Sequence, residues 1–304
     1  MSANNENNMS DKVAVVTGSN KGLGYIIVRD LCRRGVGVVY LTARDERRGL
    51  DAIEALRKEG LNPVFHQLDV TDKESVKRFA QHLKEKHGGI DILINNAAVI
   101  TTDFNKTTFE DSVNVLDANY FSILTIQEYI FPVLKDNARV LNISSDAGHI
   151  SNLENPYWIK RLTSEDLKLE DINDFVNWFL DSVKNGTLKE DDFVETGILA
   201  YRISKVALSA LTRVQQKQVG RGISINSLHP GFIKTNMTKN SGFLELDDAG
   251  IAPVYFVLDA DQSLKGKYLW FDKTEKEWTD HKLKIHAKMD IFMEHVRMNN
   301  KDYV

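Results

Sequence analysis

Hydrophobic residues in the first half of the chain follow two alternating patterns. Short apolar runs such as "VAVV" (13–16) and "DILI" (91–94) are each followed by a longer segment in which apolar residues recur every three to four positions. The short runs are typical of strands buried on both faces of a parallel sheet, and the longer segments are typical of amphipathic helices. Five such strand and helix units follow one another before position 146. The pattern predicts an α/β fold with a Rossmann-type, doubly wound parallel sheet and helices on both faces.

The second half of the chain continues the alternation. It predicts a helix over 199–218, a strand over 223–228, a helix over 244–258 and a last strand over 266–271. No linker rich in Pro, Gly or Ser separates the two halves. We therefore expect a single domain over residues 12–278, preceded by a flexible N-terminus at residues 1–11.

Two segments depart from the alternation. Residues 146–198 form an insertion with apolar residues at helical spacing, followed by "NG" as a stop signal. That stripe consists of Ile172, Phe175, Val176, Phe179, Leu180 and Val183. Residues 279–304 form a C-terminal tail whose apolar stripe predicts a helix docked on the body. A helix that binds a partner or a membrane surface is the alternative, because it fits the same spacing. The tail stripe consists of Ile285, Met289, Phe292 and Val296.

Composition narrows the class of protein. The 304 residues are 42% hydrophobic and 27% charged, with a net charge of -4 and no long basic stripe, so we expect a soluble protein that binds no nucleic acid. One cysteine, Cys32, excludes an intrachain disulfide framework, and the histidines lack the spacing of metal-ligand pairs. Neither a signal peptide nor a run of ~20 apolar residues is present, which predicts a cytoplasmic protein with no integral membrane segment.

A glycine-rich stretch, "TGSNKGLG" (17–24), stands where the first strand meets the first helix. Glycines let the backbone approach a pyrophosphate, and the helix N-terminus supplies free N–H groups. A glycine-rich turn without a ligand is the alternative. The candidate dinucleotide-binding residues of this stretch are Gly18, Asn20, Lys21, Gly22, Leu23 and Gly24.

The residue after the second strand indicates which dinucleotide binds. Arg44 stands where an acidic residue would hold a ribose 2′-hydroxyl, and a guanidinium suits a 2′-phosphate instead. Lys21 in the glycine loop adds a second positive charge. The pattern favours NADPH over NADH, with the alternative that Asp45 or Glu46 holds a hydroxyl.

The stretch "YRISK" holds Tyr201 and Lys205 four positions apart, on one face of the predicted helix. Moving the pKa of a phenol from about 10 to near 7 requires about 4 kcal/mol, and an ammonium at ~4 Å in an effective dielectric of ~20 supplies about that much. Upstream, "VLNISS" places two serines at the carboxyl end of a strand, where a hydroxyl can polarise a carbonyl. The pair alone is a weak motif, because one such spacing is expected by chance.

Taken in order along the chain, these stretches resemble the short-chain dehydrogenase/reductase family. The resemblance spans Val13 to Trp278, and the chain looks most like the animal monomeric carbonyl reductases. The matching stretches are "TGSNKGLG", "LDV" (68–70), "NNAA" (95–98), "LDANYF" (116–121), "NISS" (142–145), "YRISK" and "PGFIKT" (230–235).

The resemblance implies a role for each matching residue. Tyr201 would donate a proton to the substrate oxygen, and Ser145 would hold that oxygen. Lys205 would lower the pKa of the tyrosine and bind the nicotinamide ribose. Asn119 would kink its helix and hold a water that relays protons. The implied activity is NADPH-dependent reduction of a ketone, aldehyde or quinone. A dehydrogenase that oxidises an alcohol or hydroxysteroid, and an NADP(H)-binding sensor without turnover, are the alternatives. The further cofactor contacts implied are Asp69, Val70, Asn96, Ala97, Pro230, Gly231 and Thr235, besides Tyr201 and Lys205.

Two positions bear on the substrate pocket that the resemblance implies. Asp146 follows the expected catalytic serine where the carbonyl reductases carry an apolar residue, and it either faces the pocket or turns to solvent. Phe232 offers an aromatic wall, although simple packing also explains it. In shorter members of the family the helices that carry the Asn and the Tyr form an oligomer interface. The insertion would cover that surface, which predicts a monomer.

Overall fold

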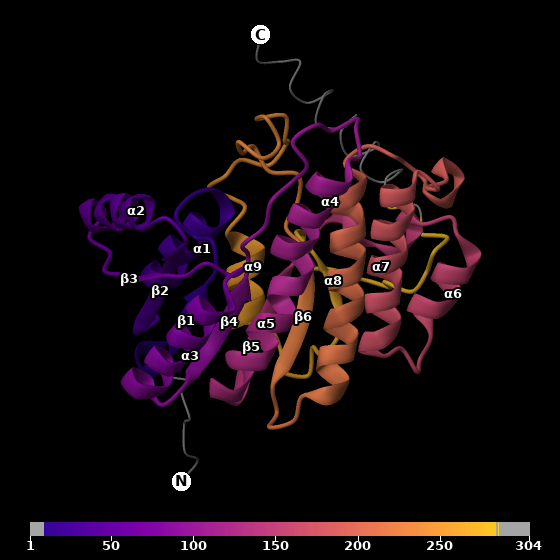
Figure 1. Cartoon of the computed structure of the whole chain (residues 1–304). Coiled ribbons are helices and arrows are strands. Elements are labelled where there is room, and N and C mark those ends of the chain that lie inside the picture. The colour runs from indigo at the N-terminus through magenta and orange to yellow at the C-terminus, as the bar shows by residue number, and fades with distance from the viewer. Residues whose placement is uncertain (1–8, 284, 286–304) are drawn as a thin grey trace, which may run out of the picture.

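An eight-stranded sheet forms the centre of the computed structural model, which describes residues 9–283 and 285 (Figure 1). Its strand order is β3-β2-β1-β4-β5-β6-β7-β8, and every neighbouring pair is parallel except β7 with β8. The strands are β1 (Val13–Val16), β2 (Val38–Ala43), β3 (Val64–Gln67), β4 (Ile90–Asn95), β5 (Leu134–Ile143), β6 (Ser224–His229), β7 (Tyr268–Trp270) and β8 (Glu275–Lys276). The order reverses between β1 and β4, which is the topological switch point of a doubly wound sheet. The predicted fold class is confirmed.

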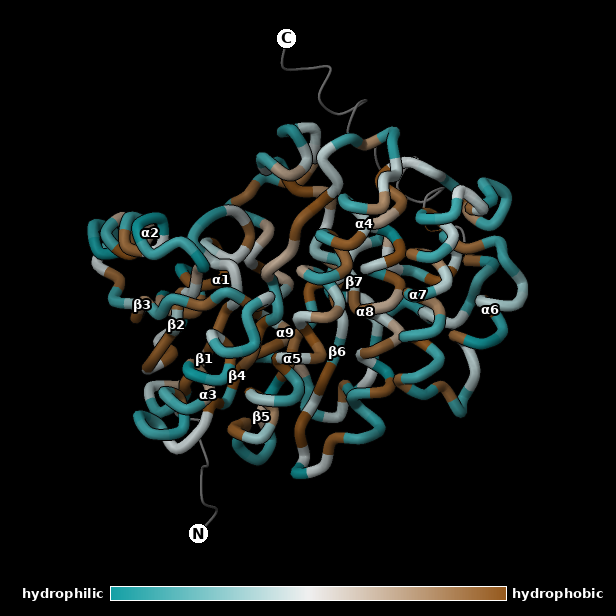
Figure 2. The backbone as a smooth tube through the Cα atoms, viewed as in Figure 1, coloured by the Kyte–Doolittle hydropathy of each residue, from teal (hydrophilic) through white to brown (hydrophobic). Residues whose placement is uncertain are grey.

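Helices cover both faces of the sheet, and each face has its own hydrophobic core. One face packs against α1 (Gly22–Arg33), α2 (Glu46–Lys58) and α9 (Ile251–Leu258). The other packs against α3 (Lys73–His87), α4 (Phe109–Leu116), α5 (Ser122–Tyr129) and α8 (Leu199–Gln218). In β1 the side chains alternate between the two cores, Val13 and Val15 on one side and Ala14 and Val16 on the other. Figure 2 shows the result, with hydrophobic strands at the centre and more hydrophilic helices such as α2 and α3 outside.

The insertion adds a further helical layer. Residues 146–198 contain α6 (Pro156–Thr163) and α7 (Leu169–Asn185), and α7 lies beside α8 (Figure 1). The predicted stripe faces inward, since Ile172, Phe175, Val176 and Phe179 of α7 are fully buried in the same core as α8. Gly186 follows α7 with a φ of 64°, a left-handed conformation that ends the helix at the predicted "NG".

Two local features differ from the expected pattern or extend it. The helix predicted over 244–258 begins only at Ile251, because the backbone of Leu244 pairs with Phe232 and Lys234 across a loop. Met9–Asp11 forms a 3-10 turn, and the carbonyl of Met9 accepts a hydrogen bond from the N–H of Gly37 at 3.0 Å. The expectation for residues 1–8 lies outside the described residues. So does the predicted tail helix, apart from Ile285, which is buried.

Neither a membrane span nor a metal centre emerges from the part of the chain that the structure describes. Over residues 9–283 and 285, no helix is long and apolar enough to cross a bilayer. The same residues contain no cluster of three or more histidine, cysteine or acidic side chains arranged to hold a metal ion. Cys32 lies on α1, where burial raises the pKa of its thiol to about 11, so the thiol keeps its proton at neutral pH.

Candidate active site

The glycine loop packs directly against the segment that follows β4. A Cβ atom on Gly18 would stand 2.8 Å from the Cα of Ala97, and one on Gly24 would stand 2.5 Å from Nδ2 of Asn96. Thr17 joins the two segments, because its Oγ1 accepts hydrogen bonds from the N–H groups of Asn96 and Ala97, both at 3.0 Å. Gly22, with a φ of 59°, lies at the N-terminus of α1, and a Cβ atom added to it would have no neighbour within 4 Å. This leaves a bare backbone cradle beside free N–H groups, the arrangement that accommodates a pyrophosphate.

The end of β2 lies next to this cradle and carries the predicted 2′-phosphate residue. The N–H of Ser19 in the loop donates to the carbonyl of Thr42 at 2.8 Å, which fixes the loop against β2. Arg44 follows two residues later with an exposed side chain. Asp45 caps α2 instead, since its Oδ1 accepts the N–H of Arg48 at 2.9 Å. The carboxylate of Asp45 is therefore engaged by its own helix, which favours the arginine as the ligand-facing group.

The other predicted cofactor residues follow the carboxyl ends of the next strands. Asp69 and Val70 follow β3, and Oδ1 of Asp69 accepts the N–H of Thr71 at 3.0 Å in a tight turn. Pro230 and Gly231 follow β6. Because parallel strands end at one edge of the sheet, all of these segments lie along the same rim.

The serine and the tyrosine of the predicted catalytic set meet at this rim. Ser145, just beyond β5, and Tyr201, in the first turn of α8, share a side-chain hydrogen bond that favours the ionised tyrosine. The neighbouring Ser144 points into the core, where its Oγ lies 2.7 Å from Oγ of Ser209. The structure thus distinguishes the two serines of "NISS", because Ser144 pairs with Ser209 in the core whereas Ser145 acts on the pKa of the tyrosine.

Lys205 lies one turn beyond Tyr201 and is 2% exposed. Its Nζ donates a 2.7 Å hydrogen bond to the carbonyl of Ile143 and stands 5.5 Å from the centre of the Tyr201 ring. Burial lowers the pKa of the Lys205 ammonium to about 7. Such an amine is only partly charged at neutral pH.

The surroundings of Tyr201 shift the pKa of its phenol in both directions. Burial raises the pKa of Tyr201 above its ordinary value, the hydrogen bond from Ser145 opposes this, and the charge of Asp146 adds to the rise. Lys205 is not among the groups that shift the pKa of Tyr201 here, and its role in lowering that pKa stays a prediction.

Asn119 lies in a π-helical turn, η2 (Asp117–Phe121), between α4 and α5. Its Oδ1 accepts the N–H of Val99 at 2.8 Å, and its Nδ2 donates to the carbonyl of Val99 at 2.9 Å and to Oγ of Ser204 at 3.0 Å. The side chain therefore inserts between its own helix, the loop after β4 and α8, which accounts for the expected break in the helix.

Asp146 faces the site. Its Oδ1 accepts a hydrogen bond from Oγ of Ser145 at 2.7 Å. The N–H of Asp146 donates to Nδ1 of His229 at 2.8 Å, and its carbonyl accepts Nδ2 of Asn152 at 2.9 Å. Of the two orientations that the sequence left open, the structure has the one toward Ser145.

The loop after β6 carries Phe232, whose role as a wall of the substrate pocket stays a prediction. Gly231 has a φ of 91°, and a Cβ there would stand 3.0 Å from Leu244, so the turn requires glycine. Phe232 is half-buried, with its ring centre 6.5 Å from that of Phe243. Farther on, the N–H of Thr235 donates to Oγ1 of Thr238 at 3.0 Å, which closes the loop.

Tyr268 belongs to the site although no sequence motif pointed to it. Its hydroxyl donates a 2.5 Å hydrogen bond to the carbonyl of Ser145, and its pKa is raised by burial and by the charges of Asp146 and Tyr201. The residue stands at the start of the last parallel strand. Only the sheet order, which sets β7 beside β6, brings it next to the serine.

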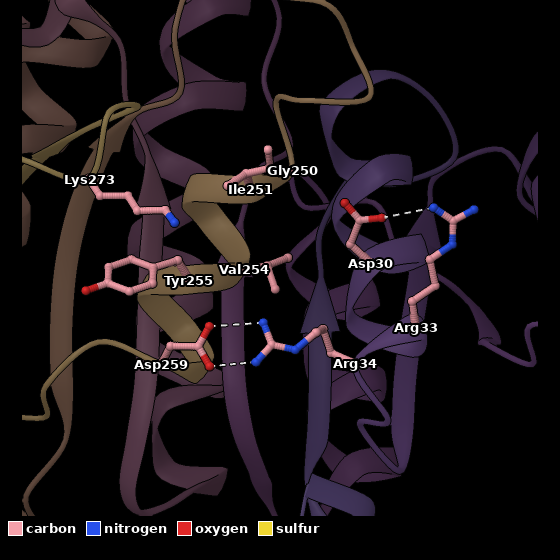
Figure 3. Close-up of a pocket in the computed structure, with 9 residues that line it drawn as sticks. All are labelled: Asp30, Arg33, Arg34, Gly250, Ile251, Val254, Tyr255, Asp259 and Lys273. Atoms are coloured by element: carbon pink, nitrogen blue, oxygen red, sulfur yellow. Dashed lines mark hydrogen bonds and ion pairs between the residues drawn. The ribbon is translucent and has the colours of Figure 1, made fainter.

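A hollow of about 290 Å³ lies elsewhere, between α1 and α9 (Figure 3). One ion pair across it joins the ends of the two helices, with Nη2 of Arg34 2.6 Å from Oδ1 of Asp259. Both side chains are well exposed, so the pair contributes little to stability. None of the predicted site residues lines this hollow, and the chemistry described above lies at the rim of the sheet instead.

Comparisons with known proteins agree with this geometry. Residues 12–157 match the family described as short chain dehydrogenase. The chain is 34% identical over 257 residues to carbonyl reductase [NADPH] 1 of Bos taurus, covering 82% of this chain and 91% of that protein. This chain belongs to the short-chain dehydrogenase/reductase family. Among its members of known structure, salutaridine reductase from Papaver somniferum aligns with a TM-score of 0.79 and 29% identity over 86% of this chain and 99% of the other.

A second structure of the family resembles the chain over a similar span. NADPH-bound carbonyl reductase from chicken fatty liver aligns with a TM-score of 0.67 and 26% identity, covering 88% of this chain and 99% of that one. The family match itself ends at residue 157, inside the insertion, whereas these alignments extend over most of the chain.

Proposed function

We propose that this member of the family reduces a carbonyl compound with NADPH, with Tyr201 as the proton donor. The observation that carries the proposal is the position of Tyr201 in the first turn of α8, with the buried amine of Lys205 5.5 Å from the centre of its ring. The relationship to proteins named carbonyl reductase [NADPH] supports the cofactor and the reaction class.

The residues present fit NADPH. Gly18 and Gly24 let the loop pack against Ala97 and Asn96, and the open space at Gly22 leaves room for a pyrophosphate at the N-terminus of α1. Arg44 at the end of β2 pairs with a 2′-phosphate, and Lys21 at the start of α1 adds positive charge. When bound, NADPH supplies the hydride that adds to the carbonyl carbon and is itself oxidised to NADP⁺.

The side chains of the protein handle the proton and the oxygen. The Tyr201 hydroxyl gives its proton to the carbonyl oxygen as the C=O double bond becomes a C–O single bond, so that the product is an alcohol. The Ser145 hydroxyl holds the same oxygen and stabilises its developing charge. A phenol with a raised pKa keeps its proton until the oxygen becomes basic, which suits a donor in the reductive direction.

Lys205 and Asn119 complete the proposed proton path. With a pKa of about 7, the Lys205 amine exchanges protons readily near neutral pH and can return one to Tyr201 after each turnover. Asn119 holds the loop after β4 against α8 through Val99 and Ser204. The chain is proposed to be a monomer, because α7 covers the helices that shorter members use for association. The cytoplasm is the compartment proposed for it.

The test measures the oxidation of NADPH in the presence of menadione, monitored as the loss of NADPH absorbance. Tyr201→Phe should lower kcat about 10²–10⁴-fold while NADPH still binds. Tyr157→Phe is the matched control, because Tyr157 is 59% exposed on α6 and should leave the rate unchanged. A Tyr201→Phe protein with full activity would refute the role of the tyrosine. Binding of NADPH by the wild-type protein without turnover of any carbonyl would favour a sensor.

A further inference from the structure

The loop that carries Ser145 lies beyond the hydrogen-bond ladder of the sheet. The pairing of β5 with β6 ends at Ile143 and Leu228, and the N–H of Ser144 still donates to the carbonyl of Leu228 at 2.8 Å. Ser145 is the next residue, and residues 145–149 (the serine loop) form a 3-10 turn after the strand. The position of the Ser145 backbone therefore depends on contacts that the ladder does not supply.

Tyr268 supplies one of these contacts from the far side of β6. It lies on β7, which pairs with β6, and its hydroxyl donates a 2.5 Å hydrogen bond to the carbonyl of Ser145. The Tyr268 side chain is only 2% exposed, and its ring centre lies 5.5 Å from that of His149 in the serine loop. Because the one proton of this hydroxyl is given to the carbonyl, Tyr268 fixes the peptide group that follows Ser145 and donates nothing to a substrate.

The segment after β8 holds the other end of the serine loop. Nε1 of the buried Trp278 donates to the carbonyl of Gly148 at 2.7 Å. Gly148 also packs against α8, because a Cβ atom there would stand 2.7 Å from the carbonyl oxygen of Lys205. Trp278 itself lies against α8, with Cζ of Arg213 5.4 Å from the centre of its ring. The serine loop is thus fixed both by α8 and by the segment 268–278.

A hydroxyl that stabilises a developing charge must stay at the reacting oxygen, because a misplacement of about 1 Å can lower a rate about 100-fold. On the basis of the function proposed above, we propose that Tyr268 is a positioning residue for carbonyl reduction. Its hydroxyl holds the carbonyl of Ser145 and thereby keeps the Ser145 hydroxyl at the substrate oxygen, while Trp278 fixes the loop at Gly148. Tyr268 acts on the rate only through Ser145 and touches neither substrate nor cofactor.

A double-mutant cycle tests this dependence. Tyr268→Phe keeps the ring and removes the hydroxyl, and it should lower the rate of menadione reduction about tenfold, the effect of one lost hydrogen bond. The Kd for NADPH should stay within about twofold of the wild-type value, because no cofactor contact changes. In a Ser145→Ala protein the same Tyr268→Phe change should alter the rate by less than about twofold, because the hydroxyl that Tyr268 positions is already absent.

A tyrosine with only a structural role lowers the rate by the same factor in both backgrounds. Equal factors therefore overturn the inference, and so does a Tyr268→Phe protein with the wild-type rate. Ser145→Ala should itself lower the rate about 10²–10³-fold, so the rates are measured in single turnovers with protein and menadione in excess over NADPH. If Tyr268→Phe does not fold, Trp278→Phe, which removes the N–H donor to Gly148, takes its place with the same expectation.

Tyr40→Phe is the matched control. Tyr40 is also a buried tyrosine, and its hydroxyl lies 2.9 Å from Nε2 of His82 and 2.8 Å from Nε2 of His87. It lies on β2, so the loss of its hydroxyl should leave the rate unchanged in both backgrounds. A Tyr40→Phe protein that loses as much activity as Tyr268→Phe would show that the loss of any buried tyrosine hydroxyl slows the reaction, and it would overturn the inference.

Failure of the proposed function gives a different result. A wild-type protein that oxidises no NADPH with menadione refutes carbonyl reduction itself, and a Ser145→Ala protein with full activity refutes the role of the serine. An active wild-type protein and a slow Ser145→Ala protein, together with equal factors in the cycle, leave carbonyl reduction intact and refute only the positioning by Tyr268.

Discussion

Replacing Lys205 with methionine should stabilise the fold while it lowers activity. The pKa of the Lys205 ammonium is about 7 in the folded protein against an ordinary value of 10.5. Between these two values the unfolded chain binds the proton more tightly, so the stability of the wild-type protein rises with pH through this window, and the cost of burial is fully present below it. At pH 7 that cost is about 4 kcal/mol, and at pH 9 it falls to about 2 kcal/mol.

The net gain is smaller than the cost removed. Methionine cannot donate to the carbonyl of Ile143, which Lys205 contacts at 2.7 Å, and an unsatisfied buried carbonyl costs about 1–3 kcal/mol. Lys205→Met should therefore raise the free energy of unfolding at pH 7 by about 1–3 kcal/mol, or the Tm by about 2–4 °C for each kcal/mol. At pH 9 the gain should be about 2 kcal/mol smaller, because the wild-type amine is then neutral in the folded state.

Urea unfolding of the protein without cofactor, at pH 7 and at pH 9, measures both values. Lys160→Met makes the same chemical change at an exposed position of α6 and should alter stability little at either pH. A Lys205→Met protein no more stable than wild type at pH 7, or with a gain that does not shrink at pH 9, would refute the assignment of a buried, partly neutral amine. The variant should also lose carbonyl reduction, which would show that the lysine is kept for activity at the expense of stability.

Three further predictions concern the cofactor, the insertion and the pH response. Arg44→Ala should raise the KM for NADPH about 10–100-fold and leave the KM for NADH unchanged, since one charge-assisted hydrogen bond to the 2′-phosphate is lost. Arg47 is also exposed, and an equal effect of Arg47→Ala would contradict the assignment of Arg44. Phe179→Ala, at a fully buried position of α7, should lower the free energy of unfolding in urea by about 3–5 kcal/mol, and a loss below about 1 kcal/mol would show that α7 is not part of the core. Burial lowers the pKa of His87, whose Nε2 lies 2.8 Å from the hydroxyl of Tyr40. The free energy of unfolding should therefore fall as the pH drops below about 6.5, because the unfolded chain then binds the proton more tightly. His87→Gln should weaken this pH dependence, as measured by urea unfolding at successive pH values.

The parts of the fold that the sequence predicted are those with strong local patterns. The helix expected over 199–218 coincides with α8, and the "NG" stop coincides with the end of α7. The start of α9 was placed too early because Leu244 continues the apolar spacing, although its backbone pairs with Phe232 across the loop. A local pattern cannot register such a contact, since it depends on how the loop after β6 folds back on itself.

For the site residues too, local sequence patterns could be predicted and contacts between distant segments could not. The residue types and their order predicted Ser145, Tyr201, Lys205 and Asn119 as candidates, and the rim that they occupy follows from the sheet. The direction of Asp146 depends on His229, which lies 83 positions away on another strand, so the sequence left both orientations open. The shift in the pKa of Lys205 depends on how many elements bury the amine, which spacing within one helix does not reveal.

The near-complete burial of α8 has a consequence for which parts of this chain can adapt to a new ligand. Layers on several sides, among them α7, α4 and β6, enclose the helix that carries the reactive pair, so its amide protons should exchange only when the whole domain unfolds. A helix held in this way cannot adapt to a new ligand without disturbing its neighbours. Adaptation is left to the exposed positions of the loop at 234–248, because most of 146–153 is buried and Gly148 packs against Lys205.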